Sequence, residues 1–90
     1  FQYWQNLGQD KKIKFAHLEN SYHGETLGSL SVGDLGLYKQ TFAPLLPKTL
    51  TIPLTLTPDE LDQFFAQHHH DISALIVEPM VQCVGQMNMY

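Results

Sequence analysis

Segments of helix character and segments of strand character alternate along this sequence, and this order constrains the fold more than any other feature. Parallel strands need long crossover connections, which are usually helices, so strands alternating with helices are typical of a parallel sheet. The sequence therefore predicts an α/β fold with mainly parallel strands and crossover helices. The expected order is a helix ending before Gly8, a strand at 13–18, a helix at 25–32, a strand at 50–54, a helix at 57–69 and a strand at 72–77.

The clearest local signal is the start of the helix at 57–69. Thr57 at the N-cap, Pro58 at the first helical position and Glu60 three residues after the cap form a capping box. Phe64 and Phe65 follow at a spacing that places them with the apolar face of the helix. We therefore expect both phenylalanines in the core.

The two later strands differ in the position that their residues predict. The run at 72–77 is almost wholly apolar and ends before Pro79, which is typical of a central strand covered on both faces. The strand at 50–54 contains Pro53, which cannot donate a hydrogen bond to a neighbouring strand. We expect this strand at an edge of the sheet, or ending near the proline.

Polar residues follow two of the predicted strands. One cluster lies at 21–25, after the first strand, and another at 78–82, after the last. In open α/β sheets, ligands bind beyond the carboxyl ends of the strands. The sequence therefore predicts a binding site that these two clusters share.

Composition argues against several other functions. The chain has nine acidic residues and five lysines, with a net charge of −4, whereas a nucleic-acid surface needs clustered cations. Cys83 is the single cysteine, so there is no intrachain disulfide, and no apolar run reaches the roughly 18 residues of a membrane span. The three histidines at 68–70 point about 100° apart in a helix and cannot converge on one metal ion. We expect a cytoplasmic protein with no metal, membrane or nucleic-acid partner.

Two longer stretches resemble the class III aminotransferase family. Residues 19–34, ENSYHGETLGSLSVGD, resemble the family's run around Tyr-His-Gly-(Asp/Glu)-Thr, and residues 37–46 continue the match. Residues 74–90 are similar to the family's Glu-Pro-x-Val-Gln region. The resemblance implies that residues 1–90 are part of the large domain of a fold-type-I pyridoxal-phosphate (PLP) transferase, incomplete at both ends.

The resemblance also implies a set of site residues. In that family, the tyrosine matching Tyr22 lies at the face of the PLP ring and lines the substrate pocket. An aromatic face packs well against a flat pyridinium and leaves the hydroxyl for the substrate. His23 and Gly24 would shape the turn beside the cofactor, Gly24 by allowing close backbone approach. The expected supporting residues are Glu25, Glu78 and Gln82.

Each role has a plainer structural alternative. Tyr22 is otherwise a partly buried loop residue, and His23 a residue that packs the turn. Glu25 is otherwise a charge favoured near a helix N-terminus, and Glu78 a cap for nearby backbone N–H groups.

The end of the sequence resembles one branch of the family. Branches that act on ornithine or 4-aminobutyrate carry a glutamate at the place of Val84, and here one extra residue lies at 80–81. Both features resemble the branch that forms diaminopelargonate, although Cys83 and Gln86 stand where that branch has glycine. The resemblance implies small-molecule substrates, with S-adenosylmethionine as amino donor and 8-amino-7-oxononanoate as acceptor, and a homodimer.

The family's Schiff-base lysine, the aspartate that pairs with the pyridine nitrogen, and the phosphate-binding segment have no match in this sequence. We therefore expect no catalytic residue within it and no transamination by the 90 residues alone. Two alternatives stay open. The chain could come from another class III ω-aminotransferase, or from a non-catalytic α/β binding module derived from one.

Overall fold

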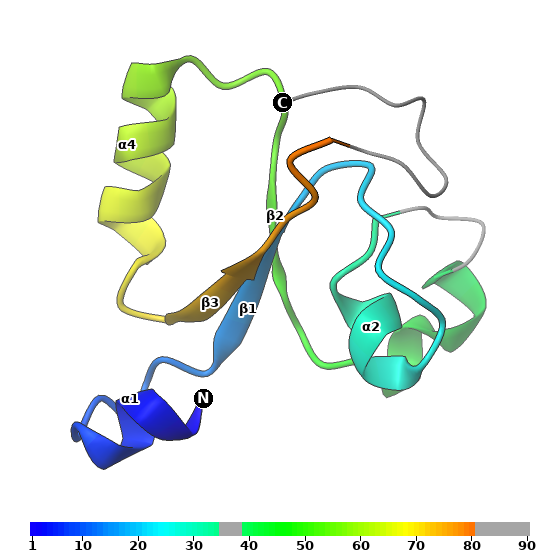
Figure 1. Ribbon diagram of the computed structural model, residues 1–90, viewed down its shortest axis with the longest axis horizontal. Helices are drawn as coiled ribbons and strands as arrows, with labels where there is room; N and C mark the ends of the chain where they lie inside the picture. The colour runs from blue at the N-terminus through cyan, green and yellow to red at the C-terminus, as the bar shows by residue number, and fades with distance from the viewer. Residues whose placement is uncertain (35–38, 81–90) are drawn as a thin grey trace.

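A computed structural model of the chain describes residues 1–34 and 39–80. Its centre is a parallel three-stranded sheet in the order β2-β1-β3 (Figure 1). This arrangement confirms the predicted α/β fold with crossover connections. The elements are α1 (Gln2–Asn6), β1 (Lys14–Leu18), α2 (Leu27–Ser31), the 3-10 helix η1 (Gln40–Leu45), β2 (Leu50–Ile52), α4 (Pro58–His68) and β3 (Ile72–Ile76).

The strand positions confirm one prediction and correct another. β2 ends at Ile52, before Pro53, and forms an edge of the sheet, as the proline predicts. β3 forms the other edge of the sheet in the described residues, so its predicted central position is wrong. β1 takes the centre instead and pairs with both neighbours. Because no described segment covers the end of β3, Leu75 is 45% exposed and Val77 42%.

The helix α4 begins as its sequence predicts. The Thr57 hydroxyl accepts a hydrogen bond from the Glu60 backbone N–H at 3.2 Å, and the Glu60 carboxylate accepts one from the Thr57 N–H at 3.3 Å. The expected core position of Phe64 and Phe65 is wrong, because both are only half-buried. Their rings contact each other edge to face, with centroids 5.7 Å apart. Figure 1 shows α4 and α2 on opposite sides of the sheet, and no residue of α4 is fully buried.

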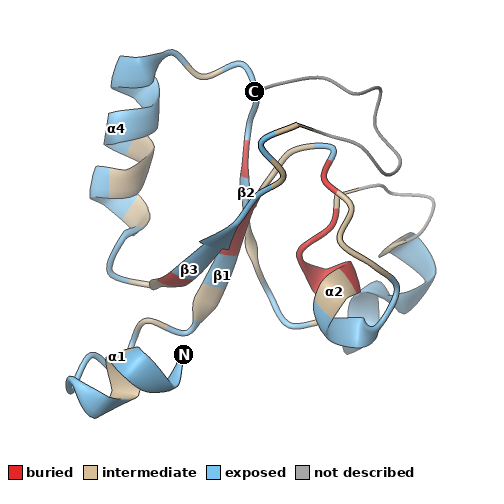
Figure 2. Cartoon of the chain, viewed as in Figure 1, coloured by how far each residue is buried: buried red, intermediate tan, exposed pale blue. Residues whose placement is uncertain are grey.

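The buried residues lie in the three strands, in α2 and in the segments next to it (Figure 2). The buried apolar side chains of the described residues are Ala16, Leu30, Val32 and Ile52. An unusual share of the interior is polar, namely His17, Ser21, Ser31 and Ser73. Hydrogen bonds satisfy the side chains of His17, Ser21 and Ser31, whereas the Ser73 hydroxyl has no partner among the described residues. The interior around His17 is therefore organised by hydrogen bonds as much as by apolar packing. None of the described helices is both long and apolar enough to cross a membrane.

Candidate functional site

The candidate site lies on the loop that joins β1 to α2, residues 19–26, which we call the β1–α2 loop. β1 and β3 run parallel, and His17 pairs with Ile76 near their carboxyl ends. The β1–α2 loop and the segment after β3 therefore leave the sheet at the same edge. The predicted clusters at 21–25 and 78–82 begin at this edge, where an open α/β sheet binds its ligands.

Two backbone positions with positive φ shape the β1–α2 loop. Asn20 has a φ of 60°, a value that asparagine tolerates better than most residues. Gly24 has a φ of 129°, which is essentially restricted to glycine. A Cβ atom at Gly24 would lie 3.1 Å from the Ser29 Cβ and 3.3 Å from its hydroxyl oxygen. Glycine is thus required here for its conformation and for close approach to α2.

Ser21 attaches the loop to the segment that follows α2. Its hydroxyl donates a hydrogen bond to the Val32 carbonyl at 3.0 Å, and its own carbonyl accepts one from the Asp34 N–H at 2.9 Å. The Asp34 carboxylate in turn accepts from the Asn20 N–H at 3.1 Å. Ser21 is buried, and Tyr22 follows it directly. The backbone that carries Tyr22 is therefore fixed immediately before the tyrosine.

His17 lies on β1 beneath this attachment and is fully buried, with an exposed fraction of 0%. Its Nδ1 atom lies 3.2 Å from the Ser21 hydroxyl and 3.2 Å from the Leu18 carbonyl oxygen. Its Nε2 atom lies 3.1 Å from the Thr49 hydroxyl and 3.2 Å from the Thr51 hydroxyl. The parallel register pairs His17 with Thr51, which places both side chains on one face of the sheet.

Burial lowers the pKa of His17 below its ordinary value of 6.5, and the positive charge of Lys39 and the nearby His23 also lower it. The Leu18 carbonyl and the Asp34 carboxylate raise this pKa, but burial is the larger influence. The imidazole is therefore neutral at neutral pH.

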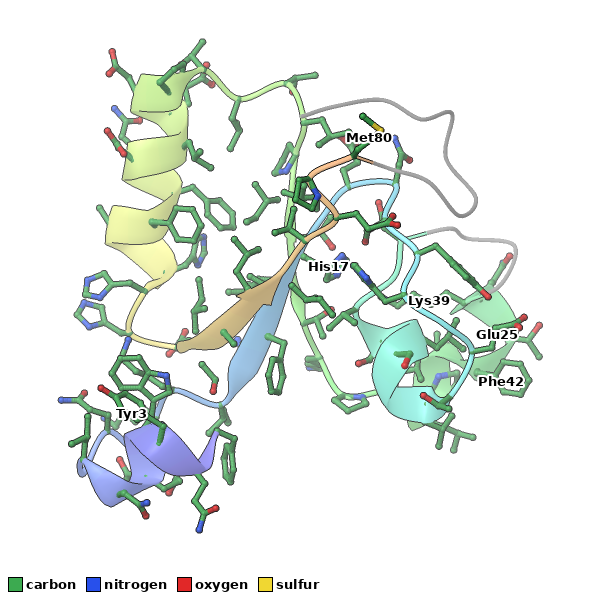
Figure 3. The ribbon with its side chains drawn as sticks, in the orientation of Figure 1. Tyr3, His17, Glu25, Lys39, Phe42 and Met80 are labelled. Carbon is green, nitrogen blue, oxygen red and sulfur yellow. The ribbon has the colours of Figure 1, made fainter. Side chains whose placement is uncertain are left out.

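Lys39 completes the cluster at the end of α2. Its ammonium group donates hydrogen bonds to the carbonyls of Ser31 at 3.1 Å and Gly33 at 2.9 Å. The Thr49 hydroxyl donates to the same Ser31 carbonyl at 2.9 Å. A lysine near a helix C-terminus satisfies carbonyls that have no partner within the helix. Figure 3 places His17 and Lys39 on the side of the sheet that α2 covers.

The structure brings some of the predicted site residues together. Tyr22, His23 and Gly24 are half-buried and consecutive on the β1–α2 loop. The Nε2 atom of His23 is buried and has no hydrogen-bond partner among the residues that the structure describes. Glu78 is half-buried and follows β3 at the same sheet edge.

Glu25 does not share the half-buried position of these residues. Glu25 is exposed and precedes Thr26, the N-cap of α2, and it lies far from Met80 in Figure 3. This placement suits its plainer alternative, a charge near a helix N-terminus. Gln82 lies outside the described residues.

A cavity of about 750 Å³ between the sheet and α2 is a separate feature. Its walls include Phe15, Val32 and Ile76, and none of the predicted site residues that the structure describes lines it. It is an uncovered apolar face of the sheet. We therefore place the candidate site at the β1–α2 loop and not in this cavity.

The sequence prediction missed His17, Ser21 and Lys39 as a connected group. A histidine inside a predicted strand, directly after the small residue Ala16, was the available signal, since an ionisable side chain in a strand interior needs partners. Those partners come from residues up to 34 positions away, so the signal could show the need but not the partners.

Comparison with known proteins agrees with this fold and loop. The Aminotransferase class-III family matches residues 1–90. An adenosylmethionine-8-amino-7-oxononanoate aminotransferase from Helicobacter pylori is 46% identical over an alignment of 92 positions, which covers 94% of this chain and 21% of that protein. The enzyme of the same name from Anoxybacillus flavithermus is 38% identical, covering 99% of this chain and 23% of its own length. The chain thus spans about a fifth of the length of these curated relatives.

Solved structures give the same result. The crystal structure of the adenosylmethionine-8-amino-7-oxononanoate aminotransferase from Methanocaldococcus jannaschii superimposes with a TM-score of 0.78 at 27% identity, over 89% of this chain and 19% of that one. An omega transaminase from Pseudomonas jessenii, solved in complex with PMP, gives a TM-score of 0.71 at 28% identity, over 88% of this chain and 21% of its own. The fold is that of part of a fold-type-I PLP transferase. The sequence resemblance is confirmed, and this chain belongs to the class III aminotransferase family.

Proposed function

We propose that this chain is part of the cofactor-binding large domain of a PLP-dependent aminotransferase. The whole protein would transfer an amino group from S-adenosylmethionine to 8-amino-7-oxononanoate, giving 7,8-diaminononanoate and the keto acid of the donor. The observation that carries this proposal is the 46% identity with the Helicobacter pylori enzyme over nearly the whole chain. The Val84 position and the extra residue at 80–81 support the same branch.

The residues of the β1–α2 loop suit a flat, polar aromatic cofactor. Tyr22 offers a half-buried aromatic ring at the carboxyl edge of the sheet, where a ring can pack against a pyridine face. The Nε2 atom of His23 is a buried polar atom without a hydrogen-bond partner within residues 1–34 and 39–80, and such an atom is usually satisfied by a group that completes the site. When bound, PLP carries the amino group between donor and acceptor.

Each residue of the chain then has a distinct task. Tyr22 would hold one face of the cofactor and direct its hydroxyl at the substrate. His23 and Gly24 would form the turn that brings the backbone close to the cofactor. We propose Glu78 and Gln82 as members of the surrounding polar network, and Glu25, which is exposed beside the N-cap of α2, as a charge at its rim.

In this proposal the catalytic groups belong to other parts of the whole protein. The proposal also makes the whole protein a cytoplasmic homodimer. The names of the relatives support small-molecule substrates, because they are those of an aminotransferase that acts on 8-amino-7-oxononanoate. Sedimentation of the full-length protein tests the dimer, and a monomer with full activity would contradict it.

The experiment is an assay of the full-length protein with PLP, S-adenosylmethionine and 8-amino-7-oxononanoate. We expect 7,8-diaminononanoate, detected by mass spectrometry, and no product without the donor. The similarity to the Pseudomonas jessenii omega transaminase favours one other activity, a broader ω-aminotransferase. Turnover with 4-aminobutyrate or ornithine and none with S-adenosylmethionine would select that alternative. Failure to bind PLP at all would leave the non-catalytic binding module.

A further inference from the structure

The hydrogen bonds around His17 determine which of its nitrogens carries the proton. The Leu18 carbonyl can only accept a hydrogen bond. The Ser21 hydroxyl donates its single hydrogen to the Val32 carbonyl, so it too can only accept from His17. Both neighbours of Nδ1 are therefore acceptors at 3.2 Å, and Nδ1 must carry the hydrogen.

The opposite nitrogen has complementary partners. The Thr49 hydroxyl uses its hydrogen on the Ser31 carbonyl at 2.9 Å, which leaves the Thr51 hydroxyl as the donor to Nε2 at 3.2 Å. With the Nδ1–H tautomer, every hydroxyl of this cluster has an acceptor for its hydrogen. The neutral ring is thus satisfied on both sides although no part of it reaches solvent.

This arrangement gives the hydrogen bonds of His17 a direction. One side of the ring holds Thr51 of β2, and the other side donates to Ser21, which carries Tyr22 as its next residue. Because Ser21 accepts from His17 and donates to Val32, it is held between β1 and the end of α2. A buried network whose members are all satisfied favours one arrangement of the segments that it joins.

We propose that His17 is a positioning residue, whose Nδ1–H holds Ser21 and thereby sets the place of Tyr22 at the cofactor. This inference rests on the proposed PLP-binding function and deepens it, because His17 would act on the cofactor only through the β1–α2 loop. The imidazole reaches the loop through its hydrogen bond to the Ser21 hydroxyl.

The test compares two replacements of His17 in the full-length protein. His17→Asn places an amide N–H near the position of Nδ1, and so keeps a donor for Ser21. His17→Gln carries its amide further along the side chain, near the position of Nε2, and loses that donor. We expect the PLP dissociation constant to rise about 5- to 10-fold in His17→Gln, the scale of one lost hydrogen bond. In His17→Asn the PLP dissociation constant should stay within about 3-fold of that of the unmodified protein, because the hydrogen bond to Ser21 is kept.

Two further variants distinguish positioning from stability alone. Ser21→Ala removes the acceptor and leaves His17 in place, so it should weaken PLP binding as His17→Gln does. The double variant, His17→Gln with Ser21→Ala, should lose no more PLP affinity than either single variant. Thr57→Ala is the control, because it removes the capping box of α4, whose hydrogen bonds involve no residue of the His17 cluster, and it should lower the melting temperature while PLP affinity stays unchanged. Ser21→Ala also keeps the test decisive if His17→Gln does not fold.

The outcomes separate this inference from the proposed function. An unmodified protein that binds no PLP would refute the proposed function. Normal PLP affinity in Ser21→Ala, or equal losses of PLP affinity in Ser21→Ala and Thr57→Ala, would refute the positioning role of His17 while the proposed function stands.

Discussion

Replacing Gly24 by alanine should destabilise the β1–α2 loop more than any other glycine-to-alanine change that the structure describes. At a φ of 129°, alanine adopts a backbone conformation that is essentially restricted to glycine, at a cost of about 1–3 kcal/mol. The new Cβ would also lie 3.1 Å from the Ser29 Cβ, so α2 must shift or the loop must open. The strained φ and the close contact both lower the stability of the variant. The contact is with a Cβ atom, so rotating a flexible side-chain end cannot relieve it.

Gly28 provides a matched control on α2, four residues further along. A Cβ atom there would meet no described atom within 4 Å outside its own helix backbone and chain neighbours, and its φ is ordinary. Alanine in a helix is more favourable than glycine by about 0.5–1 kcal/mol. The two variants should therefore differ in the free energy of unfolding by about 1.5–4 kcal/mol, with Gly24→Ala the less stable.

The assay is denaturant unfolding of the full-length protein, with PLP binding measured in parallel. A double variant, Gly24→Ala with Ser29→Gly, separates the two causes when it is compared with Ser29→Gly alone. The single variant measures the cost of glycine in α2 and of the lost hydrogen bond from Thr26 to Ser29. Against that background Gly24→Ala keeps the strained φ without the close contact, so it should still cost part of its original loss. Equal stability of Gly24→Ala and Gly28→Ala would refute the reasoning.

Three further predictions concern single residues. Because burial lowers the pKa of His17 below 6.5, the unfolded chain binds the proton more readily than the folded chain. The stability that the buried neutral ring contributes is therefore fully present above about pH 6.5 and falls as the pH drops towards the folded-state pKa. Between about pH 7.5 and pH 5.5, the melting temperature should fall less in His17→Gln than in the unmodified protein. Thr57→Ala removes the capping box of α4 and should cost about 1 kcal/mol, whereas Thr55→Ala, outside any cap, should cost little by the same unfolding measurement. Tyr22→Phe keeps the ring, so kinetics of the full-length protein should show lower turnover with PLP affinity retained, and unchanged turnover would contradict its substrate role.

The sequence predicted best those features that depend on neighbouring residues. The capping box at Thr57 involves residues three positions apart, and it appears in the structure as predicted. Pro53 ends β2 because a proline acts on its own backbone, whichever residues lie nearby. Gly24 was expected from the family's motif, and its φ and its contact with Ser29 give the physical reason for a glycine there.

Features that depend on tertiary contacts were predicted less well. The apolar run of β3 indicated a central strand, but strand order decides which strand is covered, and β1 occupies the centre. Phe64 and Phe65 were expected in the core because they follow the helical period, yet a period identifies a face and not what covers it. Both are half-buried in the described residues.

The His17 cluster shows why the arrangement beneath the candidate site could not be predicted from the sequence. Its hydrogen bond to Thr51 depends on a parallel register in which residue 17 lies opposite residue 51. A shift of this register by one residue would turn one of the two side chains to the other face of the sheet. The motif around Tyr22 identifies which residues belong to the site, but the position of Tyr22 also depends on pairing between strands that more than thirty residues separate. The same loop sequence would therefore present Tyr22 correctly only when β1 and β2 pair in this register.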